Sequence, residues 1–226
     1  LALLIGHNTV RRQVMGTENR LASDKEIKEM QNLIQVAMED GVFGMSTGLK
    51  YIPGAYSNTA EVVALASTVS KNGGIYATHM REEGIGLIES VNEAIDIGRK
   101  SNLPVQISHH KAVGKTMWGN SIKTLELIEK ANAEGLQVTA DQYPYTATST
   151  GLTVVFPAWA LSGGREQLKK RLLDSELRQK IKDKIIWNIV HDRGGGDPAS
   201  IVVASYPKNK DYDGLNLSQI TELKGF

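Results

Sequence analysis

Two histidines, His79 and His109, each follow a short apolar run, and they lie thirty positions apart in the chain. Between them, residues 87–97 carry apolar side chains at helical spacing, so the pattern predicts one strand–helix–strand unit of a parallel sheet. In such folds the carboxyl ends of the strands form the edge that holds the active site. Because neutral imidazole is the commonest metal ligand, the two histidines predict a metal site at this edge.

The other histidines do not complete such a site. A single histidine is more often a hydrogen-bonded structural residue than a ligand, and a catalytic zinc needs three protein ligands and an open position. His110 should point to the opposite face of its strand from His109. His7 is interpreted as a supporting or loop residue, and His191 as a surface residue. The remaining ligands are therefore expected outside the chain.

Lys111 lies two positions after His109 and should face the same side. It could be a solvated lysine, an anion clamp or a Schiff-base lysine, and the clamp is favoured because a Schiff-base lysine would compete with the metal. Asp141 ends the fifth predicted strand, where it could support a ligand or cap a turn. Glu82 and Glu83 fall in a loop beyond His79. None of these carboxylates is predicted to be the catalytic base.

Composition excludes several classes of function. The 226 residues carry a net charge of +1, and no segment concentrates the basic residues, so no nucleic-acid-binding or acidic-membrane surface is predicted. The absence of cysteine excludes disulfides, thiolate nucleophiles and cysteine-based zinc sites, and it fits a reducing, cytoplasmic location. No apolar run approaches the ~20 residues of a membrane span.

Five strands are predicted, beginning near positions 1, 42, 75, 104 and 136, with amphipathic helices between them. This alternation predicts an α/β fold with a parallel sheet. A doubly wound sheet and a barrel share the pattern, but chemistry at several consecutive strand ends favours part of a (β/α)8 barrel. Exposed barrel edges could then be covered by self-association.

Two regions are expected on this basis. Residues 1–145 would form the central βα units of the barrel. Residues 146–226 would form an inserted α/β elaboration and the lead-in to the last barrel strand, with further strands at 185–190 and 200–204.

Four segments, in order and at matching intervals, carry a more specific signal: 46–56 (STGLKYIPGAY), 78–83 (THMREE), 107–111 (ISHHK) and 141–145 (DQYPY). A fifth, 6–11 (GHNTVR), supports them. With these segments the chain resembles the N-acyl-D-amino-acid deacylases, or D-aminoacylases, of the amidohydrolase superfamily.

The resemblance implies a metal-dependent (β/α)8 barrel with a small β-sandwich built from both chain ends. It implies that His79 and His109 are the ligands on the fifth and sixth barrel strands that hold a tightly bound zinc. It also implies that Tyr51 and Lys111 bind the α-carboxylate of the substrate. The family's His-x-His pair, its second-strand ligand and its catalytic aspartate on the eighth strand have no match in the chain.

The function expected from the resemblance is the hydrolysis of a small-molecule N-acyl-D-amino acid, by zinc-activated water, to a carboxylate and a free D-amino acid. Because the base is expected downstream, the chain alone is predicted to be inactive. The alternatives are another amidohydrolase, such as a cyclic-amide hydrolase, or a non-catalytic barrel fragment. The context of Tyr51 and Lys111 argues against the cyclic-amide hydrolase.

Overall fold

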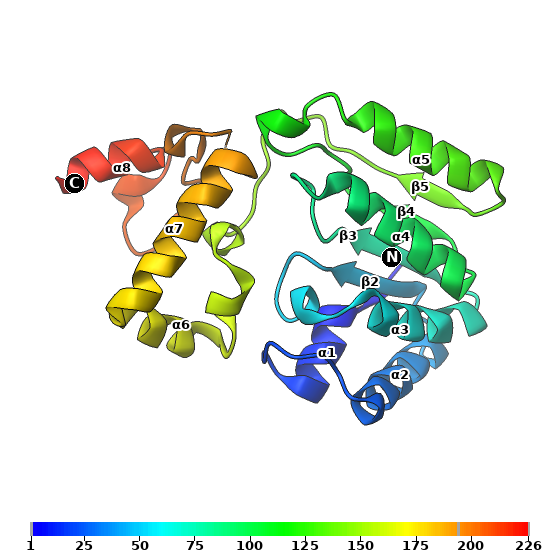
Figure 1. The fold of residues 1–226 in the computed structure, drawn as a ribbon. Coiled ribbons are helices and arrows are strands. Elements are labelled where there is room, and N and C mark those ends of the chain that lie inside the picture. The colour runs from blue at the N-terminus through cyan, green and yellow to red at the C-terminus, as the bar shows by residue number, and fades with distance from the viewer. Residues whose placement is uncertain (1, 194, 226) are drawn as a thin grey trace.

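A five-stranded parallel sheet forms the centre of the computed structural model, which describes residues 2–193 and 195–225 (Figure 1). Its strands follow chain order: β1 (Leu4–Gly6), β2 (Gly44–Gly48), β3 (Ile75–His79), β4 (Val105–Ile107) and β5 (Val138–Ala140). The predicted α/β fold is therefore confirmed. The sequence predicts a first strand that begins near position 1, whereas β1 begins at Leu4. Leu1 lies outside the described residues.

The strand order distinguishes the two architectures that the sequence left open. A doubly wound sheet reverses its order at a switch point, whereas the strands of a barrel follow one another. Every neighbouring pair here is parallel and consecutive. The sheet is thus an arc of barrel wall that does not close on itself.

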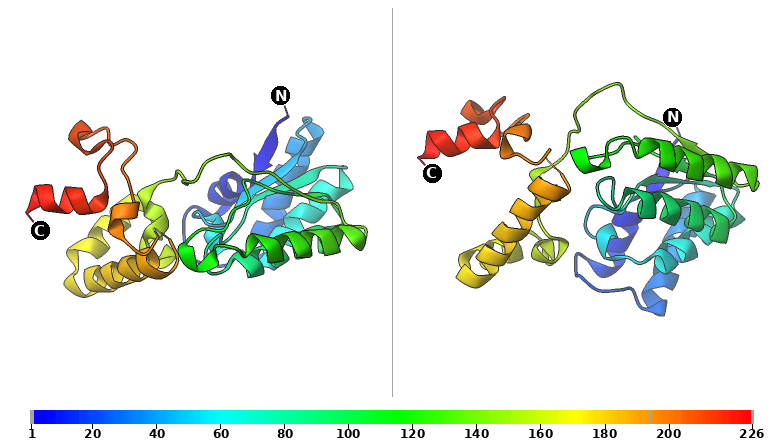
Figure 2. Two further views of the ribbon diagram at one scale, coloured as in Figure 1. Left: turned by 90° about the horizontal axis from the view of Figure 1, so that it is seen from above. Right: turned by 45° about the horizontal axis from the view of Figure 1, so that its top comes forward.

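Five α-helices accompany the sheet, and successive helices from α1 to α5 pack against each other (Figures 1 and 2). They are α1 (His7–Met15), α2 (Asp24–Glu39), α3 (Thr59–Lys71), α4 (Leu87–Ser101) and α5 (Ser121–Ala133). In the sequence, Glu26 follows Ser23 by three positions, the spacing that predicts a capping box, and the two residues form one at the start of α2. The apolar helix faces and strands share one core, in which Met30, Leu65 and Val91 are fully buried.

Residues 146–225 are helical where they are regular: α6 (Gly164–Leu173), α7 (Ser175–His191) and α8 (Leu217–Lys224). The strand predicted at 185–190 is wrong, because this stretch continues α7. Its buried residues Ile181, Asn188 and Ile189 follow a helical period, and Asp174 caps the helix start. The strand predicted at 200–204 is reduced to a single bridge between Val202 and Asn216.

Within the described residues, six short 3₁₀ helices lie in the loops: η1 (Gly54–Tyr56), η2 (Lys115–Met117), η3 (Leu152–Val155), η4 (Ala158–Leu161), η5 (Pro198–Ser200) and η6 (Lys210–Tyr212). In the described part of the chain, no helix has the length and apolar character needed to cross a membrane.

A buried polar cluster fixes the loop that follows β2. His7 and Arg11 are both fully buried on α1, and Glu61 of α3 lies between them. One Glu61 oxygen is 2.9 Å from His7 Nε2, and the other is 3.4 Å from Arg11 Nη1. Arg11 Nε also donates to the carbonyl oxygen of Pro53 at 3.1 Å. The cluster thereby anchors the loop that carries Tyr51.

We expect Glu61→Ala to destabilise the chain by about 3–5 kcal/mol, because it would leave the Arg11 guanidinium buried without its carboxylate partner. Urea denaturation followed by circular dichroism measures the free energy of unfolding. Glu29→Ala is the matched control, since the Glu29 side chain is 49% exposed on α2 and should change stability by no more than about 0.5 kcal/mol. Equal losses in the two variants would contradict the role given to the cluster.

Candidate metal centre

A cavity of about 260 Å³ opens at the carboxyl ends of the strands, and both histidines predicted from the sequence line it. Its walls include Tyr51, His79, Glu83, His109, Lys111 and Tyr143. A larger cavity of about 630 Å³ adjoins it and shares Tyr51. In the larger one, Lys50 and Arg81 are paired with carboxylates, and neither histidine reaches it. The smaller cavity is therefore the candidate site.

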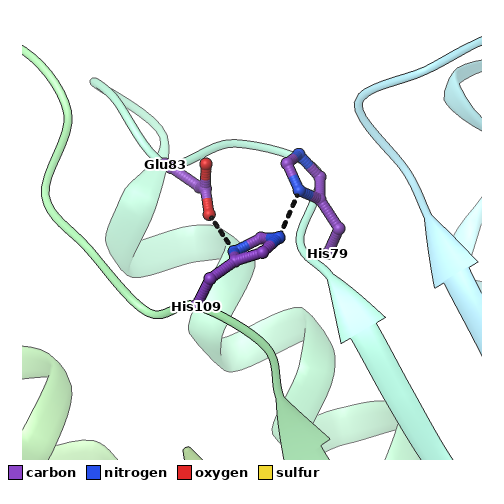
Figure 3. Close-up of side chains that lie close together, drawn as sticks. All are labelled: His79, Glu83 and His109. Atoms are coloured by element: carbon purple, nitrogen blue, oxygen red, sulfur yellow. Dashed lines mark hydrogen bonds and ion pairs between the residues drawn. The ribbon is translucent and has the colours of Figure 1, made fainter. Parts of the chain in front are cut away.

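The two imidazole rings that line this cavity meet nitrogen to nitrogen (Figure 3). His79 Nδ1 lies 2.9 Å from His109 Nε2, and the ring planes are inclined at 74°. Two nitrogens bound tetrahedrally to one zinc at ~2.0–2.1 Å would be ~3.3 Å apart. The facing atoms thus need to separate by only a few tenths of an ångström to share an ion, so the donor set fits zinc.

The charge state of His79 also suits a ligand. Burial lowers the pKa of His79 to about 4; the Glu83 carboxylate opposes this, while His109 and Lys111 add to the lowering. The ring is therefore neutral near pH 7, and neutral imidazole is the form that binds metal.

His109 occupies an unusual backbone conformation that Asp141 supports. Its φ of 43° is in the left-handed region, which is unfavourable for a residue with a side chain. One Asp141 oxygen accepts the His109 backbone N–H at 2.7 Å, and the other accepts Gln106 Nε2 at 2.6 Å. The sequence left two roles open for Asp141, supporting a ligand residue or capping a turn. This arrangement corresponds to the first, because Asp141 supports the backbone of His109.

Sequence reasoning missed Glu83, because a loop position gives no periodic signal of which way a side chain points. The structure buries Glu83 to 4% exposure and turns it into the cavity. Its Oε1 is 3.1 Å from His109 Nδ1 and accepts a hydrogen bond from Lys111 Nζ at 2.6 Å. Burial raises the pKa of Glu83, but the contacts with His109 and Lys111 outweigh it and hold the pKa below its ordinary value.

Glu83 also forms a group with the two histidines. One potential ligand atom from each of Glu83, His79 and His109 lies within 4.8 Å of the other two. Among the described residues, these three side chains form the group that could hold a metal ion.

The two residues predicted to bind the substrate lie beside the histidines. The Tyr51 ring centroid is 4.8 Å from that of His79, and its hydroxyl lies 2.9 Å from Thr150 Oγ1. Lys111 Nζ lies 2.9 Å from His109 Nδ1 and 5.3 Å from the centre of the Tyr143 ring. The structure thus brings together all four residues singled out from the sequence, and their binding roles stay predictions.

The remaining histidines lie elsewhere. His110 turns away from the cavity, and its Nε2 is 2.8 Å from Thr124 Oγ1 on α5. His191 is exposed at the end of α7. His7 is not a lining residue, and through Glu61 it belongs to the cluster that anchors the Tyr51 loop. The placements of His110 and His191 agree with the interpretations drawn from the sequence, whereas His7 is not a loop residue but the first residue of α1.

No protein-family model matches the chain. Among curated proteins, the chain is similar to a D-aminoacylase of Alcaligenes xylosoxydans xylosoxydans, with 45% identity over 67% of the chain and 31% of the relative. It is 31% identical to an N-acyl-D-glutamate deacylase of the same organism over 91% of the chain and 38% of the relative. The chain thus spans about a third of the length of the curated relatives that it matches.

Solved structures show the same relationship. An N-acyl-D-glutamate deacylase from Bordetella bronchiseptica, complexed with zinc and a phosphonate inhibitor, matches with a TM-score of 0.77 and 27% identity. A D-aminoacylase that defines a subset of amidohydrolases matches with a TM-score of 0.73 and 31% identity. Each match covers 99% of this chain and 39% of the solved one. By sequence and by fold, the chain belongs to the N-acyl-D-amino-acid deacylase family of amidohydrolases.

Proposed function

We propose that the chain contributes the metal-binding and carboxylate-binding wall of a zinc-dependent hydrolase, which cleaves an N-acyl-D-amino acid to a carboxylate and a free D-amino acid. The observation that carries this proposal is the pair of facing nitrogens, His79 Nδ1 and His109 Nε2, 2.9 Å apart in a cavity that also holds a lysine. The names of the relatives and the zinc complex of the Bordetella structure support the choice of substrate class and metal.

His79 and His109 would hold the ion. When bound in such a site, zinc polarises an amide carbonyl and lowers the pKa of water toward ~7. Hydrolysis then adds the water oxygen to the acyl carbon, breaks the C–N bond and delivers a proton to the leaving nitrogen. Asp141 is engaged with the His109 backbone, and Glu83 with His109 and Lys111, so the residue that moves this proton is still predicted to lie outside the chain.

Lys111 and Tyr51 would orient the substrate. The Lys111 ammonium has three N–H donors, and Glu83 is its carboxylate partner among the described residues. The ammonium therefore retains capacity for a second anion. The α-carboxylate of an N-acyl amino acid supplies such an anion next to the scissile amide. A neutral cyclic amide offers no such group, which favours the deacylase over the cyclic-amide hydrolase.

For the metal, we expect His79→Ala and His109→Ala each to lower zinc retention strongly, because each removes one of the two nitrogens that face each other. The variants are made in the full open reading frame that contains this chain, and zinc is measured by atomic absorption after dialysis. His191→Ala, at an exposed histidine, serves as the control and should retain zinc like the unaltered protein. Full zinc content in both cavity variants would refute the metal site.

For the substrate, we expect Lys111→Ala to lower kcat/KM by about 10- to 150-fold, equivalent to about 1.5–3 kcal/mol for a hydrogen bond to a charged group. Steady-state assays with N-acetyl-D-methionine and N-acetyl-D-glutamate measure it. Lys115→Ala is the matched control, because Lys115 is exposed and is not a lining residue of this cavity. Unchanged kinetics for Lys111→Ala would remove this lysine from the site.

A further inference from the structure

We propose that Glu83 is a positioning residue that serves both halves of the site: it holds His109 in the tautomer whose Nε2 is free to bind metal, and it holds the Lys111 ammonium beside the metal position. The inference rests on the proposed function and adds a residue to it. Three observations carry it, namely the ring edge that Glu83 contacts, the construction of its loop and the charge balance at Lys111.

The first observation is the side of the ring that Glu83 contacts. A neutral imidazole carries one proton, so His109 Nε2 can bind a metal only if that proton is on Nδ1. A protonated Nδ1 needs an acceptor. Glu83 Oε1 lies 3.1 Å from it, whereas Lys111 Nζ, at 2.9 Å, can only donate while charged and so favours the opposite tautomer. Glu83 is thus the contacting side chain that can accept this proton and stabilise the metal-binding tautomer against Lys111.

This geometry also argues against Glu83 as a third ligand on the ion shared by the histidines. His79 contacts the Nε2 atom of His109, while Glu83 contacts the Nδ1 atom of His109, and these two nitrogens point outward from different edges of the His109 ring (Figure 3). A carboxylate that receives a hydrogen bond from the far side of a ligating imidazole is the usual support of a metal-bound histidine.

The loop that carries Glu83 is built to hold one conformation. The carbonyl oxygen of Glu83 accepts the backbone N–H of Val113 at 2.7 Å, on the segment that follows His109 and Lys111. On the other side, Asp192 Oδ1 accepts the backbone N–H of Ile85 at 3.1 Å. A Cβ at Gly84 would lie 1.9 Å from the same Asp192 oxygen, so a larger residue there would displace the Asp192 side chain. These contacts therefore hold the backbone on both sides of the Glu83 side chain.

Charge balance gives the same residue a second task. Lys111 is largely buried, and its 2.6 Å ion pair with Glu83 holds its ammonium group in place. Without that carboxylate, the ammonium would lie against the metal-binding histidine, and a nearby positive charge disfavours a cation in the site. Loss of Glu83 should therefore weaken both metal binding and substrate binding.

The test compares Glu83→Gln with Glu82→Gln in the full open reading frame that contains this chain. The two residues are neighbours, but Glu82 is 31% exposed and pairs with Lys50 and Arg193 instead of His109. We expect Glu83→Gln to weaken zinc affinity 10- to 100-fold, measured by competition with a chelator, and to raise the KM for N-acetyl-D-methionine at saturating zinc. Glu82→Gln should leave zinc affinity within twofold.

Tautomer state provides a readout that needs neither zinc nor turnover. In the metal-free protein labelled with [15N]histidine, the His109 ring should show the Nδ1–H form, and Glu83→Gln should shift it toward a mixture with the Nε2–H form. Glu83→Asp, which keeps the charge on a shorter side chain, should recover part of the lost zinc affinity. Circular dichroism checks that each variant is folded.

The outcomes separate the inference from the proposed function. Unchanged His109 tautomer and zinc affinity in Glu83→Gln would overturn the role of Glu83, even if the protein hydrolyses N-acyl-D-amino acids. Equal losses of affinity in Glu82→Gln would overturn it as well, because they would indicate a general effect of the loop. If the tautomer shifts as expected but no N-acyl-D-amino acid is cleaved, the proposed substrate fails and the positioning role stands.

Discussion

The parallel pairing of β3 with β4 is the constraint on which the site depends. Tyr76 pairs with Val105 and Thr78 with Ile107, and the ladder continues one step further, where Ser108 N–H donates to the Thr78 carbonyl oxygen. Side chains alternate along a strand, so a slip of one residue would exchange the core and cavity faces. This register keeps Tyr76 and Ile107 in the core and brings His79 and His109 to the same end of the sheet.

Backbone pairing alone does not orient the rings, and the loops complete that task. His109 lies beyond the end of β4 in a left-handed conformation, and Asp141 from the end of the next strand holds its backbone. Glu83 from the loop after β3 reaches its ring. His109 is thus supported by residues that follow both neighbouring strands, with Asp141 at its backbone and Glu83 at its ring. This explains why the chemistry requires several consecutive units of the barrel wall.

The helical region takes part in this support, although most of it lies apart from the sheet (Figure 2). At the end of α7, Asp192 binds the loop that carries Glu83, and Arg193 pairs with Glu82 of the same loop at 2.5 Å. Arg193 also lines the candidate cavity. The region is therefore coupled to the site through two adjacent residues, Asp192 and Arg193.

The sequence by itself determined the strand–helix alternation, the capping box of α2 and the shared strand-end position of His79, His109 and Lys111, because these follow from local periodicity and capping. The sequence pattern predicted a strand at 185–190, where the structure has part of α7. A short apolar run fits a strand or a buried helix segment equally well, and only packing decides between the two. Only the tertiary structure decided the role of Glu83 and the open arc of the sheet. Both depend on contacts between segments distant in the chain, which a linear pattern does not encode.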